Sequence, residues 1–189
     1  MSRALNLAVA GLWLAWLVFW WVSAHNVKPT RRQERLASHI LHRLPLVLAA
    51  LLYVSPAWLP SILRRRFLPP GNLPAAAGVL LVAAGLGFSV WARVHLGRNW
   101  SANVVVKEDH ALIRSGPYKH LRHPIYSGLL LAFLGMALAF GEWRGPAALG
   151  LVLAAFVLKS RREEAFMRET FPEYAAYQRE SRALIPFVY

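Results

Sequence analysis

Long apolar runs that alternate with basic connectors are the feature that most constrains how this chain can fold. A helix needs about 20 apolar residues to cross a hydrocarbon core of about 30 Å. The runs are Ala4–Val22, Leu44–Leu63, Leu73–Ala92, Pro124–Phe140 and Pro146–Leu158. The last two are short for a full crossing, so we expect them to pack against other helices. The pattern predicts an all-α integral membrane bundle of about five transmembrane helices.

Glycines and prolines indicate how these runs connect and pack. Residues 141–145, Gly-Glu-Trp-Arg-Gly, form a tight turn that predicts an antiparallel hairpin between the last two runs. Gly78, Gly85 and Gly87 lie in the third run, and small residues in a membrane helix usually mean close helix packing. Prolines late in the second run, Pro56 among them, predict a kink or a shortened regular helix there.

A net charge of +13 and the absence of cysteine narrow the functional classes. Without cysteine the chain has no disulfide, zinc–thiolate site, iron–sulfur cluster or cysteine nucleophile. The basic residues flank the apolar runs instead of forming one stripe. This arrangement favours an anionic membrane face over nucleic acid as their partner.

The distribution of lysine and arginine predicts the orientation. Seventeen of the 22 lie after the first run, after the third run, or in the tail from Lys159 onward. Because cytoplasmic segments carry the excess of positive charge, we expect a multi-pass protein, of the cytoplasmic membrane if bacterial, with a cytoplasmic C-terminus. The triplet Arg64–Arg66 runs against this orientation.

The first run could be a signal peptide or a retained helix. Residues 22–24, Val-Ser-Ala, resemble a cleavage site, but the run is longer than a signal core and ends in paired tryptophans. Such tryptophans are typical of an interfacial anchor, which favours a retained transmembrane helix. Trp13, Trp16 and Trp20 fall on one helix face and are interpreted as a belt or packing stripe.

A dense polar group occupies residues 115–128, SGPYKHLRHPIYSG, at the mouth of the fourth run. Because Pro124 is favoured at the first helical position, His123 is expected close to the cap of a helix whose positive end attracts a carboxylate or phosphate. Tyr126 lies one turn inside, on roughly the face of Arg122 and His123. A topological anchor and a functional site both fit this cluster.

Two adjacent acids, Glu163 and Glu164, follow the fifth run. Their directions on a helix differ by about 100°, so both cannot address one ligand equally. Glu164 has Arg168 four residues on, in the order that favours an ion pair, whereas Glu163 has only Lys159 four residues before it. A carboxylate here could bind ribose hydroxyls or the ammonium and sulfonium groups of a cationic cofactor.

The histidine spacings do not favour a metal site. His120 with His123, and His39 with His42, have i, i+3 spacing. However, the first pair straddles the helix boundary marked by Pro124, and no acid stands at a spacing that completes either site. We therefore expect no metal.

Several motifs in the C-terminal half resemble the isoprenylcysteine carboxyl methyltransferase family, including its short prokaryotic members. In chain order they are LGRNWS at 96–101, HALI at 110–113, GPY at 116–118, RHPIY at 122–126, the paired acids at 163–164, and FPEY at 171–174 with Tyr177. The family also resembles membrane phospholipid methyltransferases. The first three runs match only in general character.

The resemblance implies a membrane enzyme that uses S-adenosylmethionine, held in a cytosolic cofactor pocket by the C-terminal half. We therefore divide the chain into three N-terminal transmembrane helices at 1–92 and a cofactor-binding methyltransferase region at 93–189. The residues that the resemblance places around the cofactor are His110, Leu112, Tyr118, His123, Pro124, Tyr126, Glu163 and Glu164.

The sequence leaves more than one candidate for the residue that binds the substrate. The catalytic candidates are Glu163, Arg122, Lys159 and Arg161. The family carries an arginine about one turn before the paired acids, thought to serve the substrate carboxylate, but here Lys159 is nearest that position. Arg161 and Arg162 are alternatives. A lysine pairs with a carboxylate but lacks the planar fork of arginine.

The resemblance implies methyl transfer to a lipid-like or prenylated acceptor, most simply the carboxylate of an isoprenylcysteine-type compound. Three alternatives remain: a phospholipid N-methyltransferase, a nicotinamide-dependent membrane reductase, and a non-catalytic membrane protein whose polar clusters anchor helix ends. We expect membrane lipids around the protein and no nucleic acid partner.

Overall fold

A computed structural model describes residues 2–24, 30–33, 36–54, 58–100, 105–107 and 112–185. Within these ranges, side chains are not described at 30–33, 36–43 and 105–107. His110 and the pair His39 and His42 therefore lie outside the described side chains.

The regular secondary structure of the described chain is helical apart from one short pair of strands. Its long helices are α1 Arg3–Ala24, α2 Leu36–Val54, α4 Asn72–Leu96, α5 Pro124–Phe140 and α6 Arg144–Thr170. Short helical elements are α3 Ser61–Arg64, η2 Gly97–Asn99, η3 Gly116–Lys119 and α7 Tyr174–Glu180. Strands β1 Thr30–Gln33 and β2 Val105–Lys107 pair antiparallel, which joins the connectors that follow α1 and α4. The predicted all-α class is confirmed.

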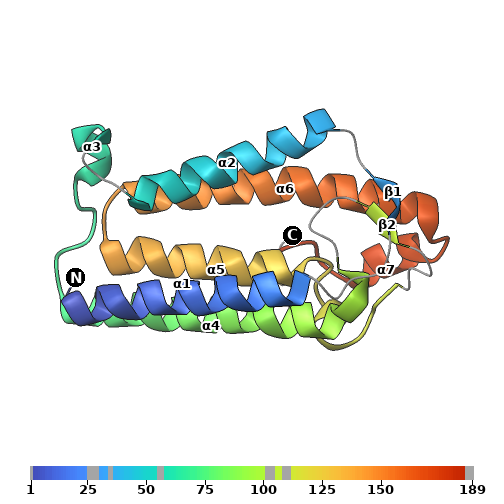
Figure 1. Ribbon diagram of the computed structural model, residues 1–189, viewed down its shortest axis with the longest axis horizontal. Coiled ribbons are helices and arrows are strands. Elements are labelled where there is room, and N and C mark those ends of the chain that lie inside the picture. Colours follow the sequence, from blue (N-terminus) through green and yellow to red (C-terminus); the bar gives the residue numbers. More distant parts are fainter. Residues whose placement is uncertain are drawn as a thin grey trace.

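The long helices lie side by side along the length of the molecule (Figure 1). Helix α4 packs against α5 and α1, and α6 packs against α2 and α5. One end of the bundle carries α3 and the α5–α6 turn, whereas the other carries β1, β2 and α7 (Figure 1). Strands β1 and β2, which belong to the two basic connectors, and α7, which belongs to the tail, therefore lie at one end, and Arg64–Arg66 lies at the other.

Two of these helices differ from the rest in the length of their apolar stretch. By length and composition alone, α1 and the segment Asn72–Asn99 could each cross a membrane, and Leu44–Val54 and Pro124–Phe140 are shorter apolar helices. Many large apolar side chains of α1 and α2 are exposed, including Leu14, Leu17 and Val47.

Two helices differ in extent from the apolar runs of the sequence. Helix α2 starts at Leu36, before the apolar run, and ends at Val54, before the end of that run at Leu63, so the regular helix is shortened as the late prolines predict. The cause is proline, which removes a backbone donor and disfavours helix in the residue before it. The second difference is at the C-terminal side. There, the predicted short fifth span continues past the paired acids as one helix of 27 residues, since no proline lies between Pro146 and Thr170.

The α5–α6 hairpin has the predicted geometry. Gly141 ends α5 in the left-handed conformation, with φ of 64°, which glycine adopts without a steric penalty. Its amide donates to the Ala137 carbonyl. Helix α6 then begins at Arg144, so the hairpin is confirmed, and it returns the paired acids toward the start of α5.

Glycines on facing sides hold α4 and α5 in backbone contact. A Cβ built on Gly78 would lie 2.5 Å from the Gly135 carbonyl oxygen, and one built on Gly85 would lie 2.5 Å from the Ala132 nitrogen. The predicted close packing is therefore confirmed at these two glycines. Gly87 has nothing within 4 Å and takes no part in it.

The pair Gly85 and Gly87 tests this packing. Gly85→Ala should lower the free energy of unfolding by about 1–3 kcal/mol, because the methyl group meets backbone that cannot rotate away. Gly87→Ala, on the same helix, should be neutral or stabilising by up to about 1 kcal/mol from helix propensity. Thermal unfolding in detergent, followed by circular dichroism, measures both. Equal effects would contradict the packing described.

Candidate active site

The start of α5 is fixed by the C-terminal segment of the chain. His123 is the N-cap of the helix and Pro124 its first residue, as the sequence predicts. The backbone amides of Arg122 and His123 donate to the carbonyl oxygens of Arg182 (2.8 Å) and Ala183 (3.0 Å). The residues just before α5 therefore cannot move independently of the tail.

His123 lies between the two adjacent acids. Its Nδ1 is 3.3 Å from Glu163 Oε2, and its Nε2 is 3.2 Å from Glu164 Oε1. An imidazole can donate from both ring nitrogens only when it is protonated. The two contacts therefore favour the imidazolium form, and they join the N-terminus of α5 to the C-terminal half of α6.

Arg122 fixes Glu164, the acid that does not line the cavity described below. Its Nε donates to Glu164 Oε1 at 2.6 Å, and its Nη1 donates to the Ser181 carbonyl at 2.6 Å. Gln178 Nε2 donates to the other oxygen of Glu164, also at 2.6 Å. The expected partner of Glu164, Arg168, instead hydrogen-bonds to Gln178 at 3.4 Å. That expectation is wrong, because a tertiary guanidinium takes the place of the local ion pair.

Glu163 contacts a different set of groups. Tyr126 donates its hydroxyl hydrogen to Glu163 Oε1 at 2.8 Å, and Lys159 Nζ lies 3.9 Å from the same oxygen. The Tyr126 ring is stacked on His123 (centroids 5.4 Å apart) and on Phe156 (4.5 Å). Lys159 Nζ lies 5.4 Å from the Tyr126 ring centroid. Glu163 is therefore held by groups from both helices of the hairpin.

One cavity of about 570 Å³ opens beside these residues, a volume typical of small-molecule sites. Its charged and hydrogen-bonding side chains are Asn99, Tyr118, Arg122, His123, Tyr126, Lys159, Glu163, Tyr174 and Tyr177. Its apolar side chains come from α1, α2, α5 and α6 and include Trp13, Trp16, Leu17, Trp20, Leu46, Ala50, Leu129, Phe133 and Phe156. The cavity therefore has a charged part and an apolar part.

The tryptophan stripe of α1 forms much of the apolar wall. Trp16 stacks on Trp20 with centroids 4.5 Å apart, and its Nε1 donates to Ser89 Oγ at 2.8 Å. Trp13 contacts the Phe133 ring edge-on at 5.5 Å. The interpretation as a packing stripe is correct, and the same face also lines the cavity.

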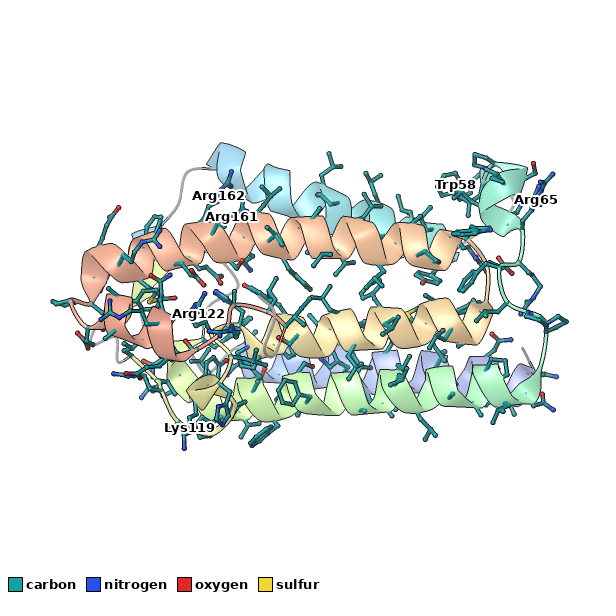
Figure 2. The ribbon with its side chains drawn as sticks, turned by 180° about the vertical axis from the view of Figure 1, so that it is seen from behind. Trp58, Arg65, Lys119, Arg122, Arg161 and Arg162 are labelled. Atoms are coloured by element: carbon teal, nitrogen blue, oxygen red, sulfur yellow. The ribbon has the colours of Figure 1, made fainter. Side chains whose placement is uncertain are left out.

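Most of the residues predicted for the site meet at this cavity. Leu112, Tyr118, Arg122, His123, Tyr126, Lys159 and Glu163 line it. Pro124 and Glu164 are buried but are not among the lining residues. Arg161 is exposed and is not among the lining residues. Figure 2 shows Arg122 inside this end of the molecule and Lys119 on its outer edge.

Two pairs of residues at this site were not predicted to belong to it. Gln178 and Ser181 bind the cluster from the tail, and nothing in their spacing indicates it. Tyr174 and Tyr177 line the cavity, although their motif was noted only as part of the resemblance. Tyr177 donates its hydroxyl hydrogen to the Tyr118 carbonyl at 2.5 Å, which links α7 to η3.

Electrostatics follow from the contacts. Burial acts to lower the pKa of His123, but hydrogen bonds with Glu163 and Glu164 outweigh it and raise the pKa above its ordinary value. Burial acts to raise the pKa of Glu164, but His123 and Arg122 outweigh it and lower the pKa to about 2. The pKa of Glu163 is lowered by its bonds with His123 and its proximity to Lys159, again against burial. Both acids are therefore ionised at neutral pH.

The charged side chains at the cavity suit an organic cation. Within the described ranges, no group of three or more histidine and acidic side chains has a geometry that could hold a metal ion. Two ionised carboxylates, a cavity of suitable volume and a buried amide oxygen without a partner, Asn99 Oδ1, fit a cofactor with a positive charge and hydrogen-bond donors.

Fold and site together define a helical bundle with a buried acid–histidine–arginine cluster at one end. A family model described as phospholipid methyltransferase matches residues 73–174. This range covers more than half of the chain and includes the start of α5 and the paired acids. The chain belongs to this family.

Individual relatives agree with the family. A probable protein-S-isoprenylcysteine O-methyltransferase of Oryza sativa is 31% identical over 115 residues, 59% of this chain and 60% of that protein. The protein-S-isoprenylcysteine O-methyltransferase of Schizosaccharomyces pombe is 31% identical over 101 residues, 51% of this chain and 43% of that protein. The predicted resemblance to isoprenylcysteine carboxyl methyltransferases is thus confirmed.

Two further comparisons extend this picture. The cobalt-zinc-cadmium resistance protein CzcN of Cupriavidus metallidurans is 34% identical over 110 residues, 57% of this chain and 50% of that protein. The solved structure of a eukaryotic intramembrane Ras methyltransferase, isoprenylcysteine carboxyl methyltransferase, superposes with a TM-score of 0.53 at 18% identity, covering 82% of this chain and 54% of that chain. It shares the fold. The chain spans about half the length of these relatives.

The cluster predicts a specific pH dependence of stability. The pKa of Glu164 is lowered from 4.5 to about 2 on folding, so its contribution is complete above about pH 4.5 and is lost as pH falls toward 2. The pKa of His123 is raised above 6.5, so its contribution is complete below that value and is lost as pH rises through the folded pKa.

Thermal unfolding in detergent across pH 3–9 measures the loss of stability at both the acid and the alkaline side. The wild-type midpoint should decline on both sides of the window between about 4.5 and 6.5, and His123→Gln should lose most of the decline on the alkaline side. A variant with the same alkaline slope as the wild type would show that His123 is not the titrating group.

Proposed function

We propose that this chain is a membrane enzyme that transfers a methyl group from S-adenosylmethionine to a lipid-tailed acceptor, with a carboxylate as the favoured acceptor group. The observation that carries the proposal is a cavity lined both by charged side chains and by apolar ones. A cofactor and a lipid chain can meet there at the boundary between Glu163 and the aromatic wall. Family membership supports the same reaction class.

The charged part suits a cationic cofactor. S-adenosylmethionine supplies an electrophilic methyl group on a sulfonium. Glu163 and Glu164 are ionised and already oriented by His123 and Arg122, so little reorganisation is needed on binding. Glu163 faces the cavity and can neutralise a positive group directly, whereas Glu164 holds His123 and Arg122 in place. Preorganised charge of this kind costs no rearrangement during the reaction.

Lys159 suits the acceptor carboxylate. Its ammonium lines the cavity next to Glu163 and over Tyr126, where the charged and apolar parts of the lining meet. An ion pair with an incoming carboxylate would place the acceptor oxygen at the charged part with its tail toward α1. We assign this role to Lys159 over Arg161, because Arg161 is exposed and does not line the cavity.

The chemistry requires no base. In the transfer, one carboxylate oxygen bonds to the methyl carbon as the carbon–sulfur bond breaks, leaving a neutral ester and a neutral thioether with no proton gained or lost. The protein therefore acts by alignment, which lowers the barrier by holding the reactants in one geometry. The aromatic and aliphatic walls keep water from the reacting groups, a contribution whose size is contested.

The surface supports a membrane location. Leu14, Leu17 and Leu51 are exposed apolar residues on α1 and α2, and exposed apolar surface of this extent is typical of a lipid-facing bundle. We propose that residues 1–92 shape the lipid side, that residues 93–189 hold the cofactor, and that the end carrying α7 faces the cytoplasm. Basic connectors gather at that end.

Phospholipid N-methylation is the second candidate, favoured by the description of the matching family. An amine acceptor would be repelled by the ammonium of Lys159, which favours the carboxylate.

Methyl-labelled S-adenosylmethionine distinguishes the two. Purified protein in detergent is incubated with the labelled cofactor and either a prenylcysteine analogue or an aminophospholipid. Base-labile label on the prenylcysteine supports O-methylation, and base-stable label on the lipid supports N-methylation. Absence of cofactor binding in calorimetry would overturn the methyltransferase proposal as a whole.

The role of Lys159 has its own test. Lys159→Met should lower kcat/KM for a carboxylate acceptor roughly 10- to 100-fold, the equivalent of one lost charged hydrogen bond. Lys159→Arg should restore most of it, and cofactor affinity should change little. Lys119→Met, on the outer edge of η3, is the control. A larger loss in Arg161→Met than in Lys159→Met would reverse the assignment.

A further inference from the structure

Asn99 presents a buried hydrogen-bond acceptor that has no partner in the described structure. Its Oδ1 is fully buried and accepts no hydrogen bond, and its side chain lines the cavity. A buried acceptor without a partner costs roughly 1–3 kcal/mol, so native structures rarely retain one. The other described atoms of this kind, on Tyr53, Arg93 and Arg144, do not line the cavity.

The protein holds this part of the cavity in a defined shape. Asn99 ends the short helix η2, which follows α4 directly. Arg93 donates to the carbonyls of Gly97 (2.8 Å) and Ser23 (2.6 Å), and its guanidinium lies 4.6 Å from the Trp100 ring centroid. Backbone and indole on both sides of Asn99 are thus fixed before any ligand binds.

Apolar side chains from both sides of Asn99 in the sequence line the same cavity. Leu96, Trp100 and Ile113 line it and pack against one core cluster that includes Tyr118. Trp100 also contacts Trp20 edge-on at 5.7 Å. Aromatic and aliphatic walls around one amide suit a planar heterocycle with a hydrogen-bond donor on its edge.

We propose that Asn99 binds the adenine of the cofactor, with Oδ1 accepting a hydrogen from the exocyclic 6-amino group. This inference rests on the proposed use of S-adenosylmethionine. An asparagine amide places an acceptor beside a donor, which matches the amino group and an adjacent ring nitrogen of adenine. The assignment divides the ligand between two places: the amide binds the neutral base, and Glu163 with its neighbours binds the cationic end.

The proposal predicts selectivity for the amino group. A site built around one hydrogen bond discriminates against a ligand that lacks the matching group, because the buried acceptor then stays unpaired. Tyrosine hydroxyls elsewhere in the cavity could adapt by rotation, but Asn99 Oδ1 has no alternative donor among the described residues.

Binding by calorimetry tests this without any turnover. The probes are S-adenosylhomocysteine and its analogue with hydrogen in place of the 6-amino group, and the proteins are wild type, Asn99→Leu and Asn99→Ala. The wild type should bind S-adenosylhomocysteine about 5- to 100-fold more tightly than the analogue. Both Asn99 variants should lose that preference, mainly by binding S-adenosylhomocysteine more weakly. Asn72→Leu, an exposed asparagine at the other end of α4, should keep it.

The outcomes separate the two proposals. A wild type that binds neither compound overturns the proposed function. A wild type that binds both equally, or a preference that persists in folded Asn99→Leu and Asn99→Ala, overturns the role of Asn99 and leaves the proposed function intact. Thermal unfolding of each variant identifies those that are folded.

Discussion

The contact on which the rest of the site depends is that of His123 with two carboxylates. A single ring joins the first residue before α5 to two adjacent residues of α6, through one contact at each nitrogen. Each carboxylate is then held by a second cation, Arg122 for Glu164 and Lys159 for Glu163. Isolated buried charges are costly and paired ones are tolerated. Removal of any one of these five groups would therefore leave a buried charge without its partner.

The packing of the helices places these five groups next to one another. The hairpin returns α6 along α5, and the glycine contacts fix α4 against α5 at backbone distance. The C-terminal segment completes the arrangement, because the Ser181 carbonyl accepts from Arg122 and Gln178 of α7 donates to Glu164. The site is thus assembled from the start of α5, the C-terminal half of α6 and the tail, while α1 supplies much of the apolar wall. This separation explains how one cavity can offer charge on one side and an aromatic surface on the other.

Several of these features could be predicted from the sequence because they are local. Proline fixes the start of α5, glycines fix the hairpin and the helix contacts, and the 100° between adjacent residues separates Glu163 from Glu164. In the structure only Glu163 of the two lines the cavity. The partners of Glu164 could not be predicted, since Arg122 and Gln178 come from distant segments and displace the local pairing with Arg168. The late prolines predict that α2 is shortened but not where it ends, and the unpartnered Asn99 Oδ1 is visible only in three dimensions.

Ultraviolet cross-linking of methyl-labelled S-adenosylmethionine to the purified protein tests the central claim most directly, since it reports where the cofactor lies. The account predicts saturable label, displaced by S-adenosylhomocysteine, in peptides that contain residues 118–126 or 159–177, since Tyr118, His123 and Glu163 line the cavity. Saturable label confined to the opposite end of the bundle, in residues 58–71 or 141–150, would contradict it.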